Sequence, residues 1–81
     1  MDTRVAIISI IVEKPESVDR LNGILHDYSE AIIGRMGIPY RQKKVNIISI
    51  AVDAPQDTIS AMSGKLGRLD GVAVKTVFAS V

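Results

Sequence analysis

The chain contains the segment VAIISIIVEKPE at residues 5–16 and the closely similar segment VNIISIAVDAPQ at residues 45–56. Seven of the twelve positions are identical, and each segment runs from an aliphatic, β-branched stretch into an acidic residue and then a proline. Stretches of this composition favour strands, and a proline is tolerated in the first turn of a helix. The repeat therefore predicts a duplicated unit in which a strand leads into a helix.

Apolar residues continue the duplication beyond the two prolines. The helical spacing i, i+3, i+7, i+10 occurs twice, in Val18, Leu21, Leu25 and Tyr28 and in Ile59, Met62, Leu66 and Leu69. We expect strands at residues 4–12, 31–40, 44–53 and 71–79, and helices at residues 15–28 and 55–67. Two right-handed βαβ halves of this kind interleave into a ferredoxin-like α+β sandwich, βαββαβ, with an antiparallel sheet in the order 4-1-3-2 and both helices on one face.

Length and composition restrict the classes of protein that fit. A chain of 81 residues predicts a single domain over residues 1–81. Ten Lys and Arg against nine Asp and Glu give a net charge of +1, so the overall charge does not attract nucleic acid or an anionic membrane. The sequence has no cysteine, which excludes disulfides, iron–sulfur ligation, thiolate zinc sites and cysteine nucleophiles. The first aliphatic stretch is too short for a signal sequence or a membrane span, so we expect a soluble, cytoplasmic protein.

The two repeated strands have apolar residues on both faces. Side chains alternate between the faces of a strand, and we assign the uninterrupted aliphatic set, which includes Ile8, Ile10, Ile48 and Ile50, to the helices. The opposite, helix-free face then carries Val5, Ile7, Ser9, Ile11, Val45, Ile47 and Ser49. A contiguous apolar patch of this size is unusual on a monomer. We therefore predict a homo-oligomer, with a symmetric dimer as the basic unit.

The sequence contains no recognisable catalytic or metal-binding pattern. His26 is the only histidine and lies off the apolar stripe of the first predicted helix, so no multi-histidine metal site is expected. The serines Ser9 and Ser49 lie within central strands without a base at a readable spacing. The stretch GKLG at residues 64–67 lacks the earlier glycine and the preceding strand of a phosphate-binding loop. We expect neither an enzyme nor a bound cofactor.

The stretch GRMGIPYRQKK at residues 34–44 departs from the aliphatic pattern of the other strands. The predicted strand order places it at a sheet edge, where Pro39 is tolerated because the outer N–H has no ladder partner. One interpretation is a solvated hairpin whose charges protect that edge from aggregation. The other is a ligand site, in which glycines give access, arginines hold an anion and the tyrosine forms a wall. Its candidate residues are Gly34, Arg35, Gly37, Tyr40 and Arg41.

The chain also resembles a known family. The resemblance rests on GRMGIPYR at residues 34–41, on IISI at 47–50 followed by DAP at 53–55, and on GKLG at 64–67 with GV at 71–72, within the βαββαβ duplication. These motifs are similar to those of the iron-only hydrogenase system regulator family, whose role is assigned because its members accompany hydrogenase maturation proteins. The resemblance implies an ACT-like fold, similar to the C-terminal domain of the nickel-responsive regulator, and a small oligomeric regulator or sensor.

Some properties of those relatives do not transfer to this chain. The nickel-responsive regulators bind their metal through His and Cys ligands, and this sequence has no such set. Amino-acid-binding ACT domains usually have a glycine after the first strand, where this chain has Glu16 and Ser17. We therefore expect a non-enzymatic homo-oligomer that binds a small ligand or a hydrogenase-system protein. The alternatives are a structural scaffold without a small ligand and, disfavoured by the near-neutral charge, direct DNA binding through the hairpin.

Overall fold

The computed structural model describes residues 2–80. Within them the elements follow one another as β1 (Arg4–Val12), α1 (Val18–Asp27), β2 (Ile32–Tyr40), β3 (Val45–Ala54), α2 (Gln56–Gly67) and β4 (Val72–Phe78). Single 3-10 turns, η1 (Pro15–Ser17) and η2 (Ser29–Ala31), precede and follow α1. The βαββαβ prediction is therefore confirmed.

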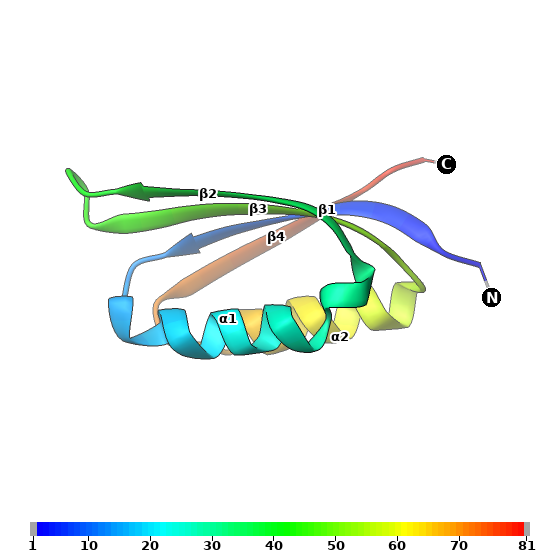
Figure 1. Cartoon of the computed structure of the whole chain (residues 1–81), viewed down its shortest axis with the longest axis horizontal. Coiled ribbons are helices and arrows are strands. Elements are labelled where there is room, and N and C mark those ends of the chain that lie inside the picture. Colours follow the sequence, from blue (N-terminus) through cyan, green and yellow to red (C-terminus); the bar gives the residue numbers. More distant parts are fainter. Residues whose placement is uncertain (1, 81) are drawn as a thin grey trace.

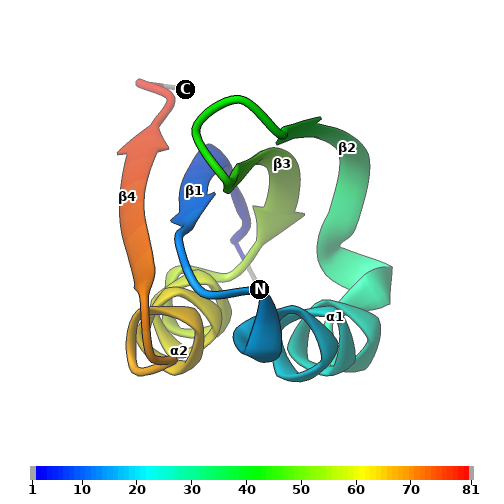
Figure 2. The ribbon, with the colours of Figure 1, turned by 90° about the vertical axis from the view of Figure 1, so that its left-hand side faces the viewer.

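The four strands form one antiparallel sheet in the order β2-β3-β1-β4, which is the predicted order read from the opposite edge. Both helices lie on the same side of the sheet (Figures 1 and 2). The repeated segments pair with each other at its centre, where Ser9 lies opposite Ser49 and Ile8 opposite Ile50. Equivalent serines of the two halves thus face one another, as expected for a duplication with local two-fold symmetry.

The hydrophobic core lies between the helices and one face of β1 and β3. Along β1 every second residue is buried, and the exposed fraction of the Ile8 and Ile50 side chains is 0%. The helices contribute the apolar residues of the predicted stripes, namely Leu21, Leu25, Ile59, Met62 and Leu66. Burial of each large aliphatic side chain contributes about 1.5–3 kcal/mol. The predicted assignment of the uninterrupted aliphatic set to the helices is correct.

The first helix begins later than the sequence pattern indicates. The predicted helix over residues 15–28 starts as the tight turn η1, and regular α-helix begins at Val18. Ser17 is buried there, and its hydroxyl donates a hydrogen bond of 2.6 Å to the carbonyl oxygen of Asp70. This bond fixes the β1–α1 connection against the loop between α2 and β4. None of the helices within residues 2–80 is long and apolar enough to cross a membrane.

Gly71 allows the two loops to approach closely. Its φ is +71°, and a Cβ added there would lie 2.5 Å from Cγ and 2.8 Å from Cβ of Lys14. The Glu13 N–H donates to the Gly71 carbonyl at 2.7 Å, and Lys14 forms an ion pair of 2.7 Å with Asp70. The hydrogen bond and charge of Asp70 raise the pKa of Lys14 above its ordinary value.

We expect Gly71→Ala to lower the free energy of unfolding by about 2 kcal/mol, because it combines a left-handed backbone with a steric clash. Urea denaturation followed by circular dichroism measures the change. Gly67→Ala is the matched control, since no atom lies within 4 Å of the position where its Cβ would be and the residue is helical. An equal response of the two variants would contradict the structural role of Gly71.

Candidate functional site

The side of the sheet away from the helices is an apolar surface that crosses all four strands. We call it the open face. Its residues follow from the strand register and the alternation of burial. They are Val5, Ile7, Ser9 and Ile11 of β1, Gly34, Met36, Ile38 and Tyr40 of β2, Val45, Ile47, Ser49, Ala51 and Asp53 of β3, and Ala73, Lys75 and Val77 of β4. Exposed fractions of 47% for Ile7, 48% for Met36 and 64% for Val77 show how much apolar side chain is accessible.

The seven residues that the sequence assigns to the oligomer contact all lie on the open face. Those of β1 are exposed, and those of β3, which lie between two neighbouring strands, are half-buried. In the three rows of paired residues through Ile7, Ser9 and Ile11, Lys75 carries the one charge, and Asp53 opposite Val5 carries a charge in the next row. An aliphatic surface with so little charge in its middle is suited to contact with another apolar surface.

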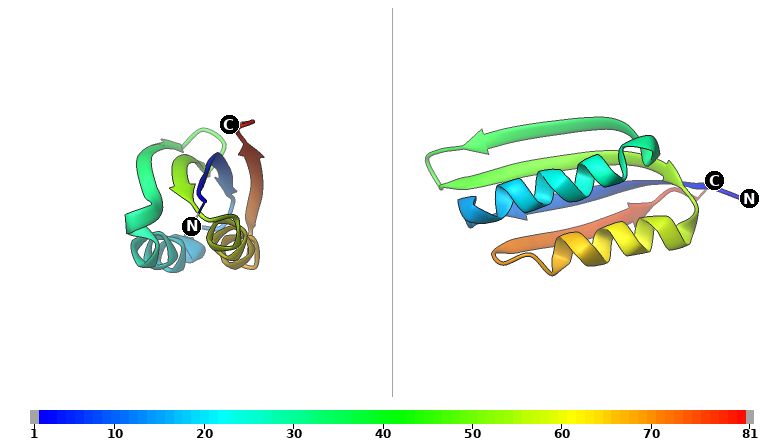
Figure 3. Two further views of the ribbon diagram at one scale, coloured as in Figure 1. Left: turned by 90° about the vertical axis from the view of Figure 1, so that its right-hand side faces the viewer. Right: turned by 60° about the horizontal axis from the view of Figure 1, so that its bottom comes forward.

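The edge strand β2 is exposed on both of its faces. Eight of its nine residues are exposed, and only Ile32 is half-buried. Seen from the helix side, β2 lies beyond α1, which packs under the central strands (Figure 3). No atom lies within 4 Å of the position where a Cβ of Gly34 or Gly37 would be, and neither glycine has a positive φ. Gly34 directly follows the β-bulge at Ile33, where a glycine is common, whereas the fold of the single chain gives no reason for a glycine at position 37.

A groove lies between α1 and the helix-facing side of β2, with Arg35 at its wall. Its volume is about 350 Å³, and its lining residues are Asn22, Leu25, His26, Ser29, Ile32 and Arg35. We call it the Arg35 groove. The Nη2 of Arg35 donates a hydrogen bond of 2.9 Å to Oδ1 of Asn22. The amide of α1 thus holds the guanidinium over the groove, and the planar group keeps other N–H donors for an anion.

The structure separates the residues that the sequence groups into one ligand site. The Arg35 side chain points toward the helix side of the sheet, because its partner on β3 is the buried Ile50. Gly37 lies in the same alternation, opposite the buried Ile48. Tyr40 lies on the open face, where its hydroxyl donates to Oε1 of Gln42 at 2.7 Å. The tyrosine therefore does not form a wall of the Arg35 groove. Gly34 lies in phase with the open face, whereas Arg35 lies in phase with the helix side of the sheet.

Arg41 lies in the β2–β3 turn, six residues beyond Arg35. At about 3.3 Å per residue of strand, the two residues are roughly 20 Å apart along the chain. Arg35 and Arg41 of one chain therefore do not lie side by side, and a site that uses both arginines stays a prediction. Arg41 instead lines a separate hollow of about 250 Å³, together with Pro15, Pro39, Tyr40, Lys44, Val45 and Asn46.

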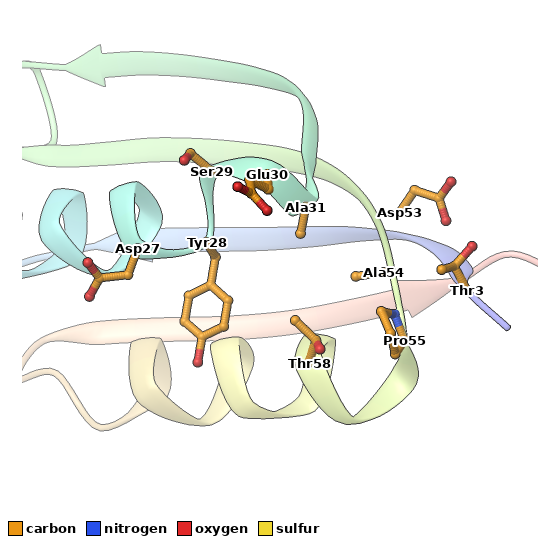
Figure 4. A pocket seen from close by; sticks show the side chains of 10 residues that line it. All are labelled: Thr3, Asp27, Tyr28, Ser29, Glu30, Ala31, Asp53, Ala54, Pro55 and Thr58. Atoms are coloured by element: carbon orange, nitrogen blue, oxygen red, sulfur yellow. The ribbon is translucent and has the colours of Figure 1, made fainter. Parts of the chain in front are cut away.

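A further pocket lies at the opposite end of the sheet from the hairpin. Its volume is about 390 Å³, and it is lined by Thr3, Asp27, Tyr28, Ser29, Glu30, Ala31, Asp53, Ala54, Pro55 and Thr58. Figure 4 shows that its lining residues come from three separate segments of the chain. The sequence analysis missed this pocket, because no short motif links those segments. Within residues 2–80 no group of three or more His, Cys, Asp or Glu side chains is arranged to hold a metal ion.

The βαββαβ topology with one uncovered sheet face makes this an ACT-like α+β domain. A formyltetrahydrofolate deformylase from Pseudomonas putida KT2440 contains the same fold, with a TM-score of 0.63 and 14% identity over 90% of this chain and 28% of the enzyme. At that identity the likeness concerns the fold alone.

The chain belongs to the TM1266-like family, described as "Iron-only hydrogenase system regulator, putative", whose model matches residues 4–76. The solved structure of the uncharacterized protein TM1266 from Thermotoga maritima is similar to it throughout. That protein is 39% identical, with a TM-score of 0.94 over 98% of this chain and 100% of its own. No curated protein sequence matches the chain.

Proposed function

We propose that this protein is a non-enzymatic regulatory module of the iron-only hydrogenase system, which self-associates and responds to a small anion. The family assignment supports the hydrogenase-system role. The observation that carries the ligand response is the guanidinium of Arg35, held by Asn22 over a groove beside the exposed strand β2.

The chemistry of the Arg35 groove favours a carboxylate or phosphate ligand. An arginine binds such groups through two parallel N–H donors, and an orientation fixed in advance reduces the entropy lost on binding. His26 and Ser29 line the same groove and add a ring nitrogen and a hydroxyl for hydrogen bonds to further oxygens. The guanidinium of Arg35, the ring of His26 and the hydroxyl of Ser29 together suffice to bind an anionic metabolite.

Self-association is supported by the apolar character of the open face. Its exposed aliphatic side chains include Ile7 and Ile11 of β1 and Met36 and Ile38 of β2. Removing side chains of this size from water contributes about 1.5–3 kcal/mol for each one that becomes fully buried. A second copy, which presents the same apolar surface, is the proposed occupant because a two-fold contact is self-complementary.

We expect Arg35→Ala to abolish the stabilisation of the protein by anions while leaving its assembly intact. At a ligand concentration of about 100 times Kd, binding stabilises the folded state by ~2.7 kcal/mol, which is a rise of several degrees in Tm. The measurement is Tm in sodium phosphate or sodium citrate against sodium chloride of equal ionic strength. The part of the parent's shift that exceeds the effect of anion exclusion should disappear in the variant.

Arg20→Ala is the matched control, because Arg20 is an exposed arginine of the same helix as Asn22 and does not line the groove. It removes the same charge and should retain the shift. Phosphate and citrate also stabilise proteins by exclusion from their surface, and that effect is common to all three proteins. Oligomers that respond to neither anion would contradict the ligand response and favour the scaffold function, for which the open face suffices.

A further inference from the structure

We propose that the hollow at the β2–β3 turn is a docking site for an acidic segment of a partner protein. The segment inserts one apolar side chain between Pro15 and Pro39 and places its carboxylates against Arg41 and Lys44. We call this site the turn hollow. The inference goes beyond the proposed function, because it concerns a protein partner and uses none of the residues that line the Arg35 groove.

The turn hollow lies between the β2–β3 hairpin and the connection from β1 to α1. Pro15 of η1 lines it from one side, and the hairpin contributes the remaining lining residues, Pro39, Tyr40, Arg41, Lys44, Val45 and Asn46. The turn extends beyond η1 at the end of the sheet (Figure 1). Pro39 and Asn46 pair with each other in phase with the helix side, so a copy packed on the open face does not cover them. The hollow is therefore accessible to a second molecule.

The turn is cationic and lacks counter-charges. Arg41, Lys43 and Lys44 are all exposed. The one ion pair within residues 2–80 joins Lys14 to Asp70, so the three cations of the turn have no carboxylate partner in the described chain. Arg41 and Lys44 line the hollow, and no acidic residue does. Charge complementarity therefore favours an anionic occupant.

Lys44 has a backbone conformation that a lysine adopts only at a cost. Its φ is +56°, and it is the one residue other than glycine with a positive φ within residues 2–80. Glycine adopts this conformation readily, and asparagine is more frequent there than lysine. Strained residues of this kind cluster at sites that bind ligands. A lysine at this position is therefore better explained by binding than by folding.

Backbone hydrogen bonds hold the two lining cations close together. The Lys44 N–H donates to the carbonyl oxygen of Arg41 at 3.2 Å, and the Lys43 N–H donates to that of Tyr40 at 3.3 Å. The first and fourth residues of such a turn have Cα atoms less than about 7 Å apart. The guanidinium and the ammonium group thus extend from neighbouring positions, and the arginine can bind a carboxylate through two parallel donors.

The size and the walls of the turn hollow favour a single side chain over a whole metabolite. Its volume of about 250 Å³ is below the ~300–1,000 Å³ of typical small-molecule pockets. Pro15, Pro39 and Val45 supply apolar surface, and the fixed φ of proline makes the walls rigid. An apolar side chain buried in such a hollow contributes affinity, and the charges around it contribute specificity.

Nucleic acid fits this site less well than an acidic peptide. Three cations neutralise few phosphates, and the net charge of the chain is only +1. Glu13 and Glu16 are exposed on either side of Pro15 in the sequence, where they repel an anion that covers the whole end of the molecule. A short acidic segment avoids them, because its carboxylates lie at the turn and its apolar side chain lies toward Pro15.

Two fluorescein-labelled pentapeptides test the docking site. The probe is Glu-Glu-Leu-Glu-Glu, and Glu-Glu-Gly-Glu-Glu has the same charge without the apolar side chain. Fluorescence anisotropy at low ionic strength should show that the protein binds the leucine peptide about tenfold more tightly than the glycine peptide. Equal affinity for both peptides, or no binding of the leucine peptide at millimolar protein, would overturn the docking site. Tighter binding of a labelled thymidine decamer would overturn the choice of a peptide as occupant.

Lys44→Gly and Lys43→Gly form a matched pair, since they remove the same charge at adjacent positions and only Lys44 lines the hollow. Lys44→Gly should weaken binding of the leucine peptide about three- to fivefold and raise the midpoint of urea unfolding, because glycine relieves the strained backbone. Lys43→Gly should bind within about twofold of the parent and should not raise the midpoint. Equal losses of affinity would mean that the peptide is attracted by diffuse charge and would refute its placement in the hollow.

Arg41→Ala separates this inference from the proposed function. The variant should bind the leucine peptide several-fold more weakly, because Arg41 lines the turn hollow. It should keep the rise in Tm in sodium phosphate that Arg35→Ala loses. Unchanged peptide affinity of Arg41→Ala, or loss of both responses together, would contradict the turn hollow as a site of its own. Loss of the phosphate response in Arg35→Ala alone leaves this inference standing.

Discussion

Ile7→Glu is expected to convert the assembled protein into monomers. The Ile7 side chain is 47% exposed on the open face, and its neighbours on the flanking strands are Ala51 and Val77. Contact between two open faces would bury a carboxylate at this position among mostly aliphatic groups, with Lys75 as the one cation in the neighbouring row. Burial of an unpaired charge costs several kcal/mol, and a two-fold contact contains the substitution twice.

Size-exclusion chromatography with light scattering measures this effect at micromolar concentration. The parent should elute with the mass of an oligomer and the variant with the mass of one chain. Ala61→Glu is the control, because Ala61 is exposed on α2 and the substitution adds the same charge on the other side of the molecule. A variant that keeps the mass of the parent would exclude the open face as the contact between copies.

The fold follows from local patterns in the sequence. The repeated aliphatic segments predict the two central strands, and the serines within them mark the side of the sheet that the helices do not cover. The spacing of Leu21 and Leu25, and of Ile59 and Met62, predicts the buried sides of the helices. Each of these features depends on residues that lie within about ten positions of one another in the sequence. It can therefore be predicted from the two-residue alternation of a strand or the 3.6-residue period of a helix.

The arrangement of the candidate site depends on an irregularity that alternation does not reveal. Ile32 lies opposite the buried Val52, and regular alternation from Ile32 would place Gly34 on the helix side as well. The bulge at Ile33 inserts one residue, so that Gly34 lies on the open face and Arg35 lies over the groove. A count that starts at Ile32 therefore assigns both Arg35 and Tyr40 to the wrong sides of the sheet, although the odd spacing between the two residues already places them on opposite faces.

The pocket in Figure 4 shows a second limit of local patterns. Asp53 at the end of β3 and Tyr28 at the end of α1 line the same hollow, although 25 positions separate them in the sequence. Only the packing of α1 against the sheet brings them together. Without a recognisable motif, a site assembled from distant segments becomes visible only once the three-dimensional arrangement is known.

Ile50→Ala is expected to produce the largest loss of stability among the substitutions considered. Ile50 is fully buried at the centre of β3, where it pairs with Ile8 beneath the helices. Truncation of a buried isoleucine costs about 2–5 kcal/mol, since it removes apolar contacts and leaves a cavity. A domain of this length has roughly 4–12 kcal/mol of stability in total, at about 0.05–0.15 kcal/mol per residue. The variant should therefore unfold at much lower urea concentration.

Ile47→Ala makes the same chemical change on the open face of the same strand, where Ile47 is half-buried. The comparison is sharpest in the monomeric Ile7→Glu background, because self-association raises the apparent stability of the parent by mass action. There Ile50→Ala should keep its full cost, whereas Ile47→Ala should cost about 1 kcal/mol or less, in line with its partial burial. In the assembled parent the cost of Ile47→Ala should rise, because the second copy buries the side chain. An identical cost of Ile47→Ala in both backgrounds would mean that no second copy covers this part of the sheet, whatever the measured mass of the particle.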